Sequence, residues 1–163
     1  MTTTARLRAT EKKRLHLVMR DGTALEAAIV IADDMPLVAF LTSRKGGWMN
    51  AMDARDPKTG AVESHMVLQT DLIALASAPD ANMAITTAAG SAATPRAVEV
   101  KLLGGQTLQG TVALAAGQRL SDLLAQSGRF LGLAATTVLP AGVGLGDVAV
   151  NTGAIRSVAE RRA

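Results

Sequence analysis

The chain has 163 residues, of which 48% are hydrophobic and 19% are charged, a composition that predicts a packed interior and excludes disorder throughout. It contains no Cys, which excludes disulfides, thiolate nucleophiles and thiolate metal sites. Aromatic residues make up only 2%, so the core is expected to consist of Leu, Val, Ile, Met and Ala. The chain shows neither a signal peptide nor an apolar run of membrane-spanning length, so a cytoplasmic protein without a membrane span is expected.

The first segment, residues 1–14, is predicted to be a basic tail. Its five cations and one carboxylate give +4, and since the formal net charge of the chain is +3, the other residues sum to −1. Two interpretations remain open: a solubilising tail, or a surface that contacts nucleic acid, an anionic membrane or an acidic partner. The candidate contacts are Arg6, Arg8, Lys12, Lys13 and Arg14.

The rest of the chain is predicted to be a tandem duplication. LVMRDGTALEAAIVIA (Leu17–Ala32) aligns with VKLLGGQTLQGTVALA (Val100–Ala115) at an offset of 83. One residue is then dropped, and the alignment continues at an offset of 82 as far as Ile73 and Ile155. Apolar character is kept although few residues are identical, which indicates two copies of one small domain.

The predicted boundaries follow from this alignment and from composition. Between the copies lies a stretch rich in small residues, Ser, Thr and Gly, with Pro near each end, which is typical of a flexible linker. The expected organisation is a tail at 1–14, a first copy at 15–76, a linker at 77–97, a second copy at 98–160 and a C-terminal tail at 161–163.

Each copy is expected to contain about five short strands and one short helix. In the second copy, apolar and polar residues alternate from Val98 to Leu102, and Gly104-Gly105 predicts a hairpin turn. Gly110 interrupts the next strand, where a missing side chain marks a bend, a bulge or a close backbone approach. An i, i+3, i+4 spacing then predicts a helix in both copies, at Leu37, Phe40 and Leu41 and at Leu120, Leu123 and Leu124.

The predicted fold class is therefore mainly β, with two tandem five-stranded barrel-like domains, each with one short helix. Val98–Val112 resembles the first half of an Sm-like motif: a strand, a Gly turn and a strand interrupted by Gly. Val148–Val158 resembles its closing strand–turn–strand. The first copy resembles the motif more weakly, with Ala27 and Asp71 at the positions of Gly110 and Gly153.

The Sm-like resemblance implies a protein that forms rings and binds RNA. In that family an Asp and an Asn after the second strand help to form the pocket for a base. This chain departs from that pattern, because Gly117–Gln126 (GQRLSDLLAQ) occupies the position with an apparent helical insertion. Aromatic platforms for stacking bases are also nearly absent. The departure argues against RNA binding, and the oligomeric habit of the family is carried over by analogy alone.

No catalytic motif is present. The chain lacks a Walker loop, a GxGxxG stretch after a strand, an HExxH motif and a GxSxG motif. His16 and His65 align with Glu99 and Asp147 and lie on predicted strands with an outward phase, so both are interpreted as solvated surface residues. We therefore predict no catalytic, cofactor-binding or metal-binding residue, no cofactor and no enzymatic activity.

The loop at 42–50 (TSRKGGWMN) is the candidate partner-binding site. It holds the only Trp beside two cations, and its partner stretch at 126–130 keeps one Arg and one aromatic residue. Either the two aromatic residues are equivalent core residues, or they belong to an aromatic–basic patch, since Trp and Arg dominate interface hot spots. The candidate residues are Arg44, Lys45, Trp48, Met49, Arg129 and Phe130.

Two functional hypotheses follow. The favoured one is a non-enzymatic scaffold or adaptor that binds another protein or assembles with itself, because open edge strands and a lean core both favour association. The alternative is a regulator that binds RNA or another nucleic acid through the basic tail and the Sm-like surface.

Overall fold

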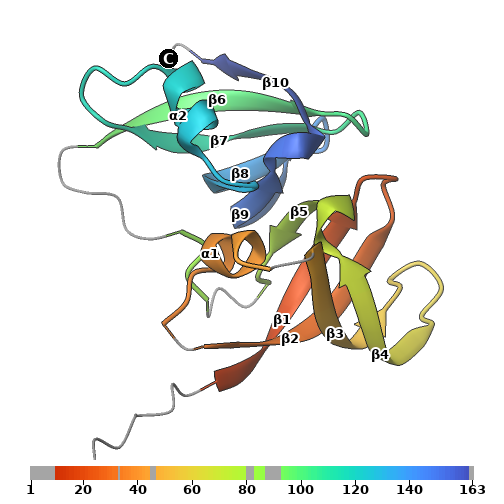
Figure 1. Cartoon of the computed structure of the whole chain (residues 1–163). Helices are drawn as coiled ribbons and strands as arrows, with labels where there is room; N and C mark the ends of the chain where they lie inside the picture. Colours follow the sequence, from red (N-terminus) through yellow and green to blue (C-terminus); the bar gives the residue numbers. More distant parts are fainter. Residues whose placement is uncertain (1–9, 33, 45–46, 80–82, 87–92, 162–163) are drawn as a thin grey trace, which may run out of the picture.

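The computed structural model describes residues 10–32, 34–44, 47–79, 83–86 and 93–161. Within these ranges, ten strands form one antiparallel sheet in the order β10-β6-β7-β8-β9-β5-β1-β2-β3-β4. The prediction of a mainly β fold is thus confirmed. The finer prediction of two five-stranded barrel-like domains is not confirmed, because β5 and β9 pair and join the strands into one continuous sheet that is not closed into a barrel (Figure 1).

The first half of the sheet comprises β1 (Thr10–Met19), β2 (Ala24–Ala32), helix α1 (Leu37–Thr42), β3 (Trp48–Arg55), β4 (Val62–Gln69), the 3₁₀ turn η2 (Thr70–Leu72) and β5 (Ile73–Ser77). The second half comprises β6 (Thr94–Leu102), β7 (Thr107–Leu114), helix α2 (Leu120–Gln126), β8 (Phe130–Leu139), β9 (Val143–Asn151), the 3₁₀ turn η3 (Thr152–Ala154) and β10 (Ile155–Glu160). β1 therefore starts inside the predicted tail and β6 inside the predicted linker. Both helices lie where the apolar spacing predicts them.

The two halves repeat one another in strand order and in register. The order β5-β1-β2-β3-β4 of the first half recurs as β10-β6-β7-β8-β9 in the second. Trp48 lies opposite Gln69 in the first half, and Phe130 lies opposite Asn151 in the second, at the offset of 82 that the sequence indicates. Residues related by these offsets are called counterparts below.

Both halves bend at the same position of their second strand. The pairing of β7 with β8 shifts register at Gly110, and the pairing of β2 with β3 shifts at its counterpart, Ala27. A Cβ added to Gly110 would lie 2.5 Å from Cγ of Leu133 and 2.9 Å from the carbonyl oxygen of Ala134. The prediction that Gly110 marks a bulge with close backbone approach is confirmed.

Gly110→Ala is expected to lower the free energy of unfolding by about 1–3 kcal/mol, because Leu133 is buried and cannot retreat from the added methyl group. Urea unfolding followed by circular dichroism measures the change. The matched control is Gly144→Ala in β9, whose added Cβ meets nothing within 4 Å and which should change stability by less than about 1 kcal/mol. Equal losses in the two variants would contradict the packing argument.

Part of the predicted flexible linker is packed. Ile85 is buried in the core of the first half. The carbonyl oxygens of Ala84 and Ile85 accept hydrogen bonds from the backbone N–H groups of Leu37 (2.9 Å) and Val38 (3.0 Å), which satisfies two amides at the start of α1. Thr86 also lies against the backbone of Gly132 in β8, so residues 83–86 contact both halves.

Candidate functional site

Strands β5 and β9 form the junction between the two halves. They are antiparallel, with Leu75 opposite Val150, Ala76 opposite Ala149 and Ser77 opposite Val148. Figure 1 shows the two strands side by side where the halves meet. Because a strand carries side chains on both faces, each junction strand supplies residues to two cores.

One face of the junction belongs to the core of the first half. Phe130 and Ala149 come from the second half, yet both are buried within this cluster. They lie there with the three buried residues of α1, and α1 contacts β8. The second half therefore helps to bury α1, whereas the counterpart helix α2 has no fully buried residue.

The opposite face of the junction belongs to the core of the second half. Leu75 of β5 is buried there with Leu102, Leu108 and Val150, and Val18 of β1 packs against the same cluster. Val18 lies directly opposite Leu75 in the β1–β5 pairing. The first half thus inserts a pair of aliphatic side chains into the second half.

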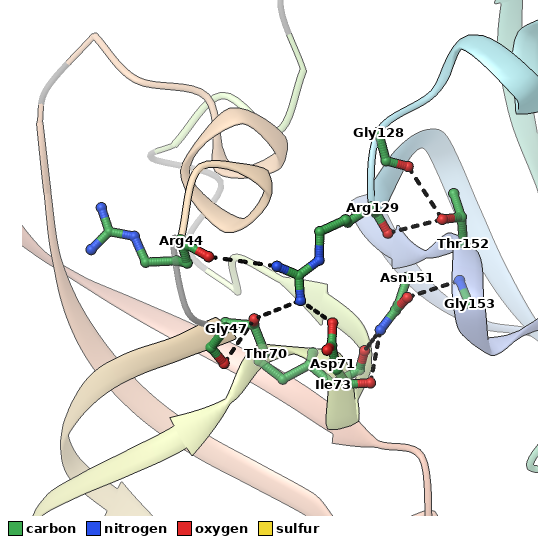
Figure 2. Close-up of polar contacts among 10 residues, drawn as sticks. All are labelled: Arg44, Gly47, Thr70, Asp71, Ile73, Gly128, Arg129, Asn151, Thr152 and Gly153. Carbon is green, nitrogen blue, oxygen red and sulfur yellow. Dashed lines mark hydrogen bonds and ion pairs between the residues drawn. The ribbon is translucent and has the colours of Figure 1, made fainter.

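A group of polar contacts, here called the clasp, closes one end of the junction (Figure 2). The guanidinium of Arg129, just before β8, forms an ion pair with the carboxylate of Asp71 in η2. It also donates to the hydroxyl of Thr70 at 3.3 Å and to the carbonyl oxygen of Arg44 at 3.5 Å. One side chain of the second half therefore contacts two loops of the first.

Asn151 forms the second part of the clasp. Its amide nitrogen donates to the carbonyl oxygens of Asp71 (3.0 Å) and Ile73 (2.8 Å), and its oxygen accepts from the N–H of Gly153 at 2.9 Å (Figure 2). Asn151 is buried, and these three bonds satisfy both ends of its amide, as a buried polar group requires. The clasp therefore fixes the orientation of the two halves.

The structure separates the residues of the predicted partner-binding patch. Arg44 and Arg129 come together in the clasp, while Met49 and Phe130 are buried. Trp48, the counterpart of Phe130, is 55% exposed. The core interpretation therefore holds for Phe130 and not for Trp48; Lys45 lies outside the described residues.

The first half carries an exposed counterpart of the junction along β4. Among the described strands, β4 pairs only with β3. Trp48 and Val67, the counterparts of Phe130 and Ala149, are about half exposed. On the other face of β4 lies a mostly apolar cavity of about 370 Å³, here called the β4 groove. Its lining residues are Met19, Arg20, Asp21, Thr23, Leu25, Met66, Leu68 and Leu72.

Sequence reasoning missed the β4 groove because its apolar residues look like ordinary core positions. The alignment does hold a signal: three apolar residues of the groove, Met19, Leu25 and Leu68, are counterparts of residues that lie around Leu75 in the second half. Only the strand order shows that β5 lies beside β9 in the second half, whereas no other described strand lies beside β4 in the first.

The described cations of the predicted basic tail lie on β1 beside carboxylates. Lys12 Nζ lies 2.7 Å from Asp53 and Arg14 lies 3.2 Å from Glu26. Lys13 lies 2.6 Å from the carboxylate of its neighbour Glu11. The hydrogen bond from Lys12 lowers the pKa of the Asp53 carboxyl below its ordinary value. Arg6 and Arg8 lie outside the described residues.

The structure places the two His residues in different surroundings. His16 is partly buried, with Nδ1 4.0 Å from Glu26, and it lines a cavity of about 640 Å³ between the halves. His65 is exposed on β4 opposite Met52. Across the described ranges, no group of three or more His, Asp or Glu residues is placed to hold a metal ion.

No described helix has the length and apolar character needed to cross a membrane. Comparison of the chain with protein-family models, with curated proteins and with solved structures found no match.

Proposed function

We propose that this protein is a non-enzymatic adaptor that binds an extended segment of a partner protein along β4. The observation that carries the proposal is the junction itself: β5 adds to the edge of β9, while the counterpart edge, β4, is left open among the described strands. Addition of a strand to an exposed sheet edge is a recurring mode of peptide recognition.

The surroundings of β4 support this mode of binding. The main-chain groups of an edge strand supply hydrogen bonds to an incoming strand, and pockets beside it select side chains. On one face Trp48 and Val67 offer exposed apolar surface, and on the other the β4 groove offers a socket. Exposed apolar surface of this kind, rimmed by polar residues, marks interaction sites.

We also propose that each half descends from one Sm-like unit. The recurring strand order and the bulge shared by Ala27 and Gly110 support a common origin. The edge pairing between β5 and β9 supports the view that such units associate through strand edges. A scaffold built on this principle needs no catalytic residues.

A synthetic peptide that carries residues 73–78 of this chain (IALASA), lengthened with Lys for solubility and labelled with fluorescein, tests the proposal. It reproduces the segment that adds to β9, so it is expected to bind the full chain in a fluorescence anisotropy titration. Leu72→Asp places a charge in the β4 groove and should weaken binding at least about tenfold, since an unpaired charge in apolar surroundings is costly.

The matched control for that titration is Leu103→Asp, which changes another exposed leucine away from the groove. It should leave the affinity unchanged. The absence of any peptide binding to the wild-type chain, or equal weakening in both variants, would count against the proposed function.

A specific observation favours a second candidate, the binding of single-stranded nucleic acid. Trp48 is exposed, and the residue before it, Gly47, lies close to the guanidinium of Arg129 in the clasp. An exposed aromatic ring is a stacking platform for a base, and a nearby cation attracts the phosphate backbone. RNA retention at low salt that falls steeply as salt rises, and that Trp48→Ala abolishes, would support this candidate. No RNA shift even at low salt would rule it out.

A further inference from the structure

Resting on the proposed function, we infer that the partner segment inserts a large aliphatic side chain into the β4 groove opposite Leu68. We further infer that Lys101 and Ser157 prevent the chain's own β10 from serving as that segment. The partner is thus an extended strand of another protein with a Leu-like residue at one defined position, and it is not a second copy of this chain.

The junction shows what the groove accepts. Leu75 lies opposite Val150, whose counterpart is Leu68. In the second half, Leu75 is buried beside Leu102 and Leu108. The counterparts of these two leucines are Met19 and Leu25, and both line the β4 groove. The groove is therefore the first-half equivalent of the position that Leu75 occupies in the second half, and no described segment fills it.

The chain's own β10 does not offer an equivalent side chain. Val18 and Leu75 face each other across β1 and β5, and their counterparts Lys101 and Ser157 face each other across β6 and β10. Both counterparts are exposed. If β10 added to β4 of a second chain, a hydroxyl would enter the groove in place of an isobutyl group, and an ammonium would approach an apolar surface. Both changes are unfavourable.

The clasp could not form again between two chains. The counterparts of Arg129 and Asp71 are Gly47 and Gly153, which have no side chains to make an ion pair. One element of a second chain does match, because α2 presents three half-buried leucines at the positions of the buried residues of α1. In a contact between two chains, α2 could therefore pack as α1 does. The aliphatic side chain in the β4 groove and the clasp would both be missing.

A gain-of-function variant tests the exclusion. Light scattering of the wild-type chain at micromolar concentration should give the monomer mass. The variant Lys101→Val/Ser157→Leu places an aliphatic pair on β6 and β10, equivalent to Val18 and Leu75. Its mass should therefore rise with concentration, as chains join end to end into open filaments or closed rings. Adding Leu72→Asp should return it to the monomer, and adding Leu103→Asp should not. Circular dichroism checks that each variant is folded.

Two peptides test, independently of that variant, whether a large aliphatic side chain fills the β4 groove. The peptide with residues 73–78 should bind the full chain at least about tenfold more tightly than the same peptide with Leu75→Ser, because burial of a leucine side chain is lost. Equal affinities would overturn the inference that a large aliphatic side chain fills the β4 groove. The failure of both peptides to bind would overturn the proposed function instead.

The mass measurements separate the same two ideas. Wild-type oligomers that Leu72→Asp dissolves would overturn the exclusion by Lys101 and Ser157, while leaving the role of β4 intact. A folded Lys101→Val/Ser157→Leu variant that stays monomeric would overturn the equivalence between the groove and the position of Leu75.

Discussion

Phe130→Ala is expected to lower the free energy of unfolding by about 3–5 kcal/mol, the range for removal of a fully buried aromatic ring. Phe130 starts β8 in the second half, but its ring is 2% exposed and lies in the core of the first half beside Phe40 and Leu41. Its removal leaves a cavity at the place where α1 rests on β8. Both the first core and the contact between the halves should be weakened.

Trp48→Ala is the matched control, because Trp48 is the counterpart of Phe130 and is 55% exposed. Its loss should change the free energy of unfolding by no more than about 0.5 kcal/mol. Urea unfolding of both variants is followed by far-ultraviolet circular dichroism. Fluorescence is unsuitable because Trp48→Ala removes the only Trp of the chain. A loss for Trp48→Ala as large as that for Phe130→Ala would contradict the asymmetry between the halves.

Leu75→Ala is expected to lower the free energy of unfolding by about 2–5 kcal/mol, the range for replacing a buried leucine with alanine. Leu75 is 4% exposed and lies in the core of the second half, although its strand also pairs with β1 of the first. The substitution removes the side chain that the first half inserts into the second. Since the two cores share β5 and β9, unfolding should remain one cooperative transition in the wild-type chain.

Leu72→Ala serves as the control for Leu75→Ala, because Leu72 is 48% exposed just before β5. Its effect should stay within about 0.5–1 kcal/mol. Calorimetry of the wild-type chain gives a further check, through the agreement of calorimetric and van't Hoff enthalpies. Two separate transitions in the wild-type chain, with Leu75→Ala affecting neither, would show that the halves fold independently of the junction.

Much of the local structure could be predicted from the sequence. The offset between the halves, both helices and the bulge at Gly110 follow from the spacing of apolar residues and from one missing side chain. These features depend on residues close in the chain or on a period of 2 or 3.6, which a sequence shows directly. The same reasoning predicted the hairpin turn at Gly104-Gly105, where the structure has a positive φ at Gly105.

The candidate site was less predictable because it depends on contacts between distant segments. The sequence singles out Arg129 as a candidate contact residue but not Asp71, and only the pairing of β5 with β9 brings the two together. The aromatic–basic loop at 42–50 and its partner stretch at 126–130 were found by composition, but their aromatic residues, Trp48 and Phe130, have opposite burial. Burial depends on which neighbour covers a face, and no local pattern contains that information.

The sequence by itself therefore determined the duplication, the mainly β class, the helices and the position of the bulge, because each is written in the periodicity of apolar side chains. The tertiary structure alone decided that the halves share one sheet, that Phe130 is buried and Trp48 is exposed, and that an apolar cavity lies beside β4 where Leu75 packs beside β9. The physical reason is that β4 and β9 hold equivalent places in the two halves, and among the described strands β9 has a second neighbour, β5, and β4 has none.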